Sequence, residues 1–240
     1  MNVSGNHYLD KTRGILYSYL ACLPLLALYE ILIRISQPSA EYAVRISVDV
    51  WFRTLFSFLG LNALSAVLMI AAFTGAIIVY QKRSELKHLK KAYFGYMLLE
   101  SFFYAILVGT LIGIFLEAIL LIDASNPLYQ LNKLQLIALS LGAGLYEELF
   151  FRVILVSALV YLLNKVFTTK YIAYSLSAII AALIFSGVHY IGEYGDIFTV
   201  SSFLFRFLFG LALNIIYVTR GFGIAAWTHA IYDLLVITFL

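Results

Sequence analysis

Charged side chains are scarce in this sequence, and that scarcity limits the class of protein it can encode. Only 12% of the 240 residues are Asp, Glu, Lys or Arg, against about 25% in an ordinary soluble domain. Apolar residues make up 63% of the chain, which is the composition of a polytopic membrane protein and not of a soluble domain with one large core. The net charge of +3 is small, and we expect no nucleic-acid partner.

Cysteine is nearly absent as well. The single residue, Cys22, cannot form an intramolecular disulfide, so cysteine usage gives no information on the redox compartment. Mostly polar residues precede the first apolar run and no small-residue cleavage site follows it, so we expect no cleavable signal sequence. The chain has no internal repeat, low-complexity segment or linker, which indicates one integral membrane domain.

Long apolar runs are what the sequence does contain. A membrane-spanning helix needs about 20 mainly apolar residues. Seven runs are candidates for such helices: 14–36, 58–80, 93–122, 133–163, 171–189, 201–219 and 221–240. The sequence therefore predicts an all-α, polytopic transmembrane helical bundle of about seven spans. The third and fourth runs are long enough to require a tilt, a protrusion or a break, and "LGAG" at 141–144 indicates a bend.

One further segment, 41–57, predicts an interfacial helix. Arg45, Asp49 and Arg53 are spaced four apart, so they share one helical face, and apolar residues occupy the rest. This pattern is typical of a helix that lies in the membrane interface and does not cross the bilayer.

The distribution of Lys and Arg predicts the orientation of the chain. Segment 81–91 is strongly basic, and the positive-inside rule places such a loop in the cytoplasm. Lys165, Lys170 and Arg220 fall on the same side, whereas the alternate loops, 122–130 and 191–198, are acidic or neutral. The pattern predicts a multi-pass cell-membrane protein with a cytoplasmic N-terminus and an exterior C-terminus.

Ionisable residues within spans are costly to bury and mark functional sites by default. The candidates are Glu30, Glu100, Glu117, Glu147, Glu148, Arg152, His189, Arg206, His229 and Asp233. We interpret Glu30, Glu117 and Arg206 as anchors because they lie near span ends and can reach water. Glu100 lies deeper, and it either forms a structural hydrogen bond or lies near the functional site.

The sequence "GLYEELFFR" at 144–152 combines a charge pair with an unpaired carboxylate. Glu148 and Arg152 are four apart and neutralise one another on one helical face. Glu147 points elsewhere and has no local partner. An apolar setting disfavours the ionised form of a carboxylate and so makes it a stronger base. We therefore expect Glu148 to hold structure and Glu147 to carry chemistry.

Two later spans repeat the four-residue spacing. Phe185 and His189 share one helical face, and so do His229 and Asp233. A carboxylate, two imidazoles and an acceptor from three helices can converge inside a bundle. Each pair alone is a weak signal, but the ordered set is far less expected by chance.

This ordered set, E-E-x-x-x-R, F-x-x-x-H and H-x-x-x-D, resembles the motifs of the CAAX protease and bacteriocin-processing (CPBP, or Abi) family of intramembrane endopeptidases, whose type members are type II CAAX prenyl endopeptidases. The resemblance covers a core at 131–240. The divergent region 1–130 is interpretable only as membrane spans and the interfacial helix. Asp233 stands where the prenyl-protein enzymes have Asn, so we infer no prenyl specificity.

The resemblance implies a role for each motif residue. Glu147 and His189 would activate a water molecule, with Glu147 as general base. His229 and Asp233 would polarise the scissile carbonyl and stabilise the oxyanion, although an ionised Asp233 would instead orient His229. The residues implied to support the site are Glu148, Arg152 and Phe185.

The need for a metal ion is open from sequence. One carboxylate and two histidines are a common ligand set for catalytic zinc, and Glu147, His189 and His229 would supply it here. The chain has no H-E-x-x-H motif, so we favour a site without a cofactor and keep zinc as the alternative.

The sequence thus predicts an intramembrane endopeptidase for a membrane-associated or exported protein or peptide, with a site that lies within the lipid bilayer and opens toward the exterior. Intramembrane carboxylates also serve ion-coupled transporters, although we find no inverted repeat. A non-catalytic bacteriocin-immunity or binding protein on the same fold is a further alternative. The substrate's identity and the oligomeric state are not readable from the sequence.

Overall fold

The computed structural model describes residues 4–38, 43–119, 131–192 and 195–239. Within these ranges the regular elements are all helices, and no strand is formed. The predicted loop 122–130 lies outside the described residues. Parts of the predicted segments 41–57, 93–122, 191–198 and 221–240 lie outside them too.

The helices follow one another along the whole described chain. Their bounds are α1 Ser4–Thr12, α2 Ile15–Ser36, α3 Ser47–Phe58, α4 Ala63–Gln81, α5 Arg83–Leu86, α6 Lys91–Ile119, α7 Lys133–Gly142, the π-helical segments η2 Ala143–Glu147 and η3 Leu149–Leu155, α8 Val156–Leu163, α9 Lys170–Val188, α10 Val200–Arg220 and α11 Phe222–Phe239.

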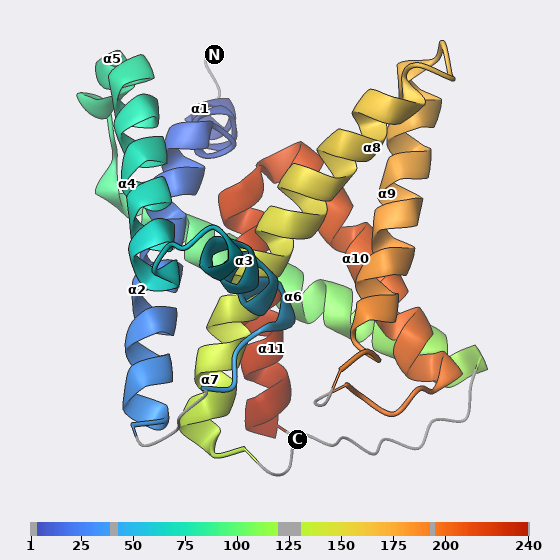
Figure 1. Ribbon diagram of the computed structural model, residues 1–240. Coiled ribbons are helices and arrows are strands. Elements are labelled where there is room, and N and C mark those ends of the chain that lie inside the picture. The colour runs from blue at the N-terminus through green and yellow to red at the C-terminus, as the bar shows by residue number, and fades with distance from the viewer. Residues whose placement is uncertain (1–3, 39–42, 120–130, 193–194, 240) are drawn as a thin grey trace.

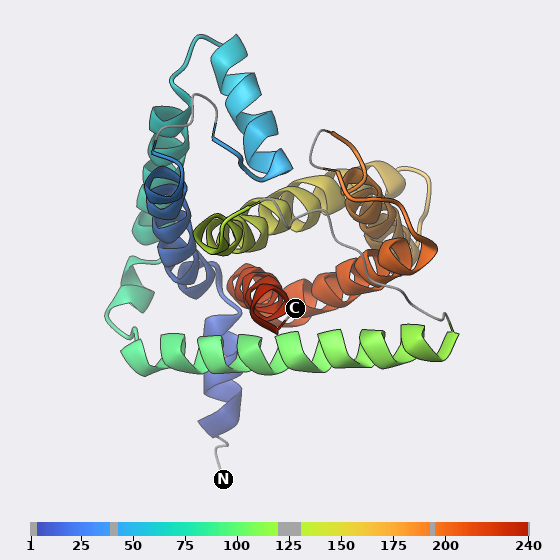
Figure 2. The same cartoon turned by 90° about the horizontal axis from the view of Figure 1, so that it is seen from below.

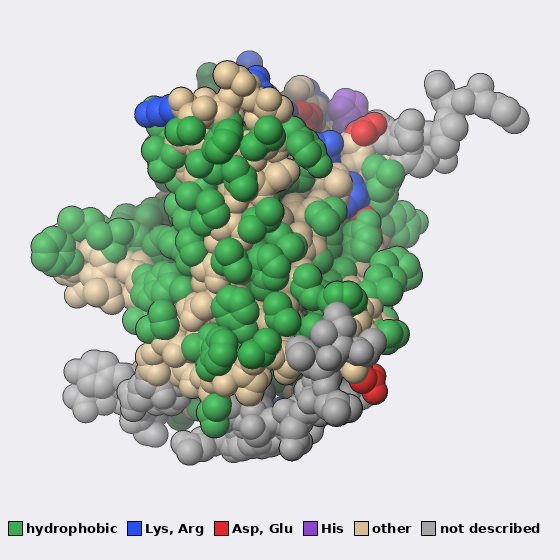
Figure 3. Space-filling model, turned by 90° about the vertical axis from the view of Figure 1, so that its right-hand side faces the viewer, with side chains coloured by type: hydrophobic (Ala, Val, Ile, Leu, Met, Phe, Trp, Pro, Cys, Tyr) green, Lys and Arg blue, Asp and Glu red, His purple; other side chains and the backbone are tan. Residues whose placement is uncertain are grey.

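The all-α polytopic architecture is confirmed. Five helices (α2, α4, α6, α9 and α10) are long and apolar enough to cross a membrane. The apolar α11, in the seventh predicted span, is shorter. The fourth predicted span, 133–163, is a run of helical segments from α7 to α8 whose centre is π-helical, and we call it the composite helix. The protein is a multi-pass membrane protein, and hydrophobic side chains cover most of the face shown in Figure 3.

Local sequence signals explain several helix boundaries. Asn132 and Gln135 form a reciprocal capping box at the start of α7, in which each side chain accepts a hydrogen bond from the other residue's backbone N–H. Thr199 caps α10 by accepting the backbone N–H of Ser202. Gly221 separates α10 from α11 with φ of 88°, a backbone conformation that favours glycine.

Helix α11 forms the centre of the bundle (Figure 1; Figure 2). It packs against α2, α6, α7, η2 and α10. Its buried face carries small side chains, among them Ala225, Ala226 and Ala230, which have no exposed surface. Small residues let helix backbones approach closely in membrane proteins, so α11 can be enclosed on several sides. Helix α6 runs along one edge of the bundle over its whole width in Figure 2.

Helix α3 departs from the predicted segment 41–57 in two respects. It begins only at Ser47, because both backbone groups of Val44 hydrogen bond to the Gln37 side chain and so do not enter a helix. Its polar face is turned inward, with Asp49 fully buried, while apolar residues such as Phe58 are exposed. The helix projects from the bundle as an arm in Figures 2 and 3.

Gly144 permits a close contact between α11 and the composite helix. A Cβ atom added at Gly144 would lie 2.4 Å from the carbonyl oxygen of Ala226 and 2.6 Å from the Cβ of Ala230. Neither is the end of a flexible side chain. The absence of a side chain at this position therefore determines how near η2 and α11 can lie.

We predict that Gly144→Ala destabilises the folded protein by about 1–3 kcal/mol, the usual cost of overpacking. Gly95→Ala on α6 is the matched control, because a Cβ atom there would have no neighbour within 4 Å. Thermal unfolding in detergent measures both variants. Equal midpoints for the two variants would contradict the packing account.

Candidate active site

The composite helix changes geometry where it carries its two glutamates. Helix α7 ends at Gly142, η2 ends at Glu147, and η3 begins at Leu149. A π-helix closes its hydrogen bonds over five residues and fits an extra residue into the turn, and such turns occur frequently at functional sites. The bend predicted at 141–144 falls at this change.

Glu148 is fully buried and contacts two side chains, the guanidinium of Arg152 and the imidazole of His229. Its Oε2 lies 3.0 Å from Nε of Arg152, an ion pair whose angle falls outside hydrogen-bond geometry. Its Oε1 accepts a 2.7 Å hydrogen bond from Nδ1–H of His229, since a carboxylate paired with arginine is an acceptor only. Glu148 therefore fixes the ring of a histidine that is 81 residues away in the chain.

His189 follows directly after the last residue of α9 and caps that helix. Its Nδ1 lies 2.7 Å from the carbonyl oxygen of Phe185. A carbonyl can only accept, so Nδ1 carries the proton. In the neutral ring the lone pair is then on Nε2, which is the nitrogen that faces Glu147.

Glu147 lies between the two imidazoles. Its Oε2 is 3.8 Å from Nε2 of His189 and 3.9 Å from Nε2 of His229. This oxygen is buried and has no hydrogen-bond partner in the described part of the chain. A buried carboxylate oxygen without a partner is costly, and the position of Oε2 between two ring nitrogens suits it to contact a water molecule or a substrate.

Asp233 lies at the more open edge of the cluster. Its Oδ2 is 3.6 Å from Nε2 of His229, beyond hydrogen-bond distance. About 31% of its side chain is exposed, against 4% for His229. The orienting hydrogen bond on His229 therefore comes from Glu148, and Asp233 faces the accessible end of the site.

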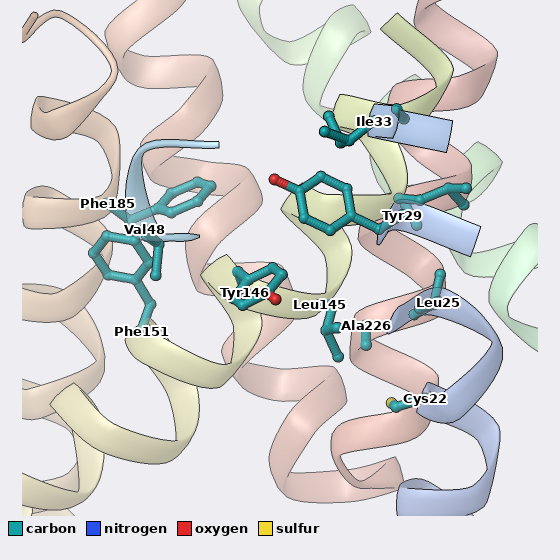
Figure 4. Close-up of a cluster of buried hydrophobic side chains, with 13 residues drawn as sticks. Cys22, Leu25, Tyr29, Ile33, Val48, Leu145, Tyr146, Phe151, Phe185 and Ala226 are labelled. Carbon is teal, nitrogen blue, oxygen red and sulfur yellow. The ribbon is translucent and has the colours of Figure 1, made fainter. Parts of the chain in front are cut away.

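Phe185 is the aromatic centre of the cluster. Its ring meets His189 at 4.9 Å and His229 at 5.8 Å between ring centroids, both edge to face. The guanidinium of Arg152 lies 4.7 Å from the centre of the ring, a cation–π contact. Phe151 packs against it at 5.2 Å, and Figure 4 shows these two side chains together. One buried ring thus contacts residues from all three helices.

The structure brings together all the motif residues identified in the sequence, and the remaining intramembrane charges have partners outside this set or are exposed. Glu30 is buried in a separate ion cluster with Arg45 and Arg53, so it is not an anchor that reaches water. Glu100 pairs with Arg220.

Arg206 lies at the edge of the cluster, near His189 and Asp233, whereas Glu117 lies outside it. Arg206 pairs with Asp196 and donates a hydrogen bond to Tyr190, which ties the segment after His189 to α10. Glu117 is exposed on α6, as expected for an anchor. The contact that sequence reasoning missed is the one between Glu148 and His229, since no local spacing signals it.

The residues considered as zinc ligands are close together but do not form a metal site as they stand. Two ligands on a tetrahedral zinc ion lie about 3.3 Å apart, whereas Glu147 Oε2 is 3.8 and 3.9 Å from the two nitrogens. Among the described residues, no group of three or more His, Cys, Asp or Glu side chains is arranged to hold a metal ion.

The fold and the site define a multi-pass membrane protein with a buried carboxylate–histidine centre. Residues 129–235 match the family model of type II CAAX prenyl endopeptidase Rce1-like proteins and carry a domain of this family. The resemblance found in the three motifs is thereby confirmed. No curated protein and no solved structure matches the chain. The family implies protease activity.

We predict that Glu148→Gln destabilises the protein far more than Glu147→Gln. The first change leaves Arg152, which is 1% exposed, without its counter-charge, and breaking a buried pair costs about 3–5 kcal/mol. The second change removes the carboxylate of Glu147, whose Oε2 has no hydrogen-bond partner in the described part of the chain. Thermal unfolding of the two variants in detergent compares them, and equal losses of stability would contradict the assignment of separate roles.

Proposed function

We propose that the protein is an intramembrane endopeptidase that hydrolyses a peptide bond of a membrane-associated or exported protein or peptide. The observation that carries this proposal is the position of Glu147. Its Oε2 is buried, lacks a hydrogen-bond partner and faces the Nε2 atoms of both histidines. This geometry suits a general base next to a second proton acceptor.

In the proposed reaction a water molecule sits between Glu147 and His189. Both Oε2 and the lone pair on Nε2 of neutral His189 can accept hydrogen bonds from it, so its own lone pair is directed at the substrate carbonyl. Glu147 takes one proton as the water oxygen bonds to the carbonyl carbon. His189 holds the water in place and needs no net change of charge.

His229 would stabilise the oxyanion that this attack creates. Glu148 accepts Nδ1–H of His229 and so fixes the direction of Nε2, which points toward Glu147 and Asp233. When Nε2 also carries a proton, the ring is a cationic donor aimed at developing negative charge. A protonated Asp233 would supply a second donor at the same edge of the site.

Collapse of the tetrahedral intermediate completes the proposed cycle. The C–N bond breaks, and Glu147 returns its proton to the departing amine. The products are a carboxylic acid and an amine, and the glutamate regains its starting charge. We propose this sequence without a metal ion, since the chain has no H-E-x-x-H motif.

The side on which the site opens is part of the proposal. Helix α9 begins at Lys170, next to a basic connection, and ends beside His189. The positive-inside rule places its start in the cytoplasm, so His189 would face the exterior, as suits an exported substrate. We expect reporters fused within 82–90 to report a cytoplasmic location, and an exterior location would contradict this orientation.

The central prediction concerns Glu147→Gln. A mixed peptide library in detergent supplies the probe, and mass spectrometry identifies a peptide that the wild-type protein cleaves. We expect Glu147→Gln and His189→Ala each to lower kcat on that peptide by about 10²–10⁴-fold, the usual contribution of acid–base catalysis. Glu117→Gln removes an exposed carboxylate on α6 and should retain wild-type activity.

Three outcomes would count against the proposal. Full activity in folded Glu147→Gln excludes it as the base. A wild-type protein that cleaves no library member favours a binding or transport role. Stoichiometric zinc in the purified protein, with activity lost on stripping and regained on reloading, contradicts the metal-free mechanism while leaving the protease assignment intact.

A further inference from the structure

A second buried ionic cluster lies outside the proposed active site. It consists of Glu30 on α2 together with Arg45, Asp49 and Arg53 at the base of α3, and we call it the α3 anchor. Arg45 contacts Glu30 at 3.2 Å and Asp49 at 2.8 Å. Arg53 contacts the same two carboxylates at 2.5 and 2.8 Å.

The α3 anchor is balanced and dense in hydrogen bonds. Two carboxylates face two guanidinium groups, and Asp49 also accepts a 2.8 Å hydrogen bond from the hydroxyl of Tyr29. Asp49 has no exposed surface, and Glu30 is 8% exposed. Ion pairs this buried tolerate little rearrangement, because the loss of one partner leaves another charge uncompensated. The base of α3 is therefore held in one position, although its apolar tip projects from the bundle.

Tyr146 connects the α3 anchor to the residue proposed as the base. It directly precedes Glu147 in η2, and its hydroxyl lies 3.5 Å from Oε1 of Glu30. Its ring packs against Tyr29 at 5.4 Å and Phe52 at 6.4 Å between centroids. Figure 4 shows Tyr29 and Tyr146 facing each other from different helices.

Helix α3 also holds the next turn of the composite helix. The rings of Trp51 and Phe52 contact Phe150 at 5.4 and 6.4 Å between centroids. Two further contacts surround η2. The ring of Tyr29 packs against Gly142, and α11 packs against Gly144. Ion pairs join α3 to α2, which also packs on η2. The contacts that α3 makes with Tyr146 and Phe150 lie on both sides of Glu147 in the chain.

We propose that the α3 anchor consists of positioning residues for the catalytic step. It fixes Tyr146 and Phe150, and through them it fixes the π-helical backbone that presents Glu147 to the two histidines. This inference rests on the proposed peptidase function, since it assigns a role in setting the geometry of that reaction. The α3 base is then a rigid wall of the site and not a lid that opens for substrate.

The test is Arg53→Met, which keeps most of the side-chain volume and removes the charge. We expect kcat on the library-selected peptide to fall about 10- to 100-fold, because small displacements of a catalytic group reduce rates by that order. KM should stay within about twofold, since no anchor residue is assigned to substrate binding. Arg53→Lys should recover part of kcat. Amide hydrogen exchange across 143–150 should become faster in Arg53→Met.

The matched control is Glu100→Gln, which breaks the buried pair with Arg220 at a distance from η2. It should lower the unfolding temperature but leave kcat and exchange across 143–150 unchanged. If Arg53→Met does not fold, Tyr146→Phe takes its place, since it removes only the hydroxyl near Glu30, and the same expectations apply with a smaller change.

Each outcome decides the inference. Unchanged kcat and unchanged exchange in folded Arg53→Met overturn it, and so does a rise in KM at constant kcat, which would make α3 a substrate-binding surface. If kcat falls equally in Glu100→Gln, the α3 anchor affects kcat only through the general stability of the fold, and the inference is also overturned. A failure of the proposed peptidase function can be distinguished from a failure of this inference, because hydrogen exchange across 143–150 can be measured without any peptidase activity.

Discussion

The proposed active site depends on one buried carboxylate, Glu148, which contacts an arginine and a histidine at once. Its contacts with Arg152 and His229 join the composite helix to α11, and Arg152 in turn lies over the ring of Phe185 on α9. A membrane interior offers no water to stabilise unpaired charge, so the partners must remain in place. Because Glu148 and Arg152 neutralise one another, the neighbouring Glu147 is not needed as a counter-charge. Its carboxylate is therefore available for chemistry.

Backbone geometry separates these two adjacent glutamates. In a chain this apolar, a second unpaired charge would be expensive, and the π-helical turns direct Glu147 toward the histidines while Tyr146 faces α2 and α3. The close approach of α11 at Gly144 and the ion-paired base of α3 enclose the same turns. In the proposed mechanism, the position of Glu147 is set by the side chains and helices that pack around η2. The polar residues of the α3 anchor, in region 1–130, contribute to this packing.

Much of this site could be predicted from the sequence because its signals are local. The spacing of Glu148 and Arg152 predicts their ion pair, and the long apolar runs predict the helical bundle. Tertiary contacts could not be predicted in the same way. No sequence spacing indicates the hydrogen bond between Glu148 and His229. Nor does any spacing indicate that the Gln37 side chain hydrogen bonds to the backbone of Val44, so that α3 begins only at Ser47. The inward polar face of α3 was equally hidden, since an amphipathic pattern does not say which face is buried.

The central claim is that Glu147 activates water and does not itself attack the substrate. The most direct measurement is a single turnover of the library-selected peptide in H₂¹⁸O, followed by mass spectrometry of the product and of the protein. We expect one ¹⁸O atom in the new carboxylate of the product and none in the Glu147 side chain. Label in Glu147, with unlabelled product, would reveal an acyl-enzyme anhydride and contradict the account.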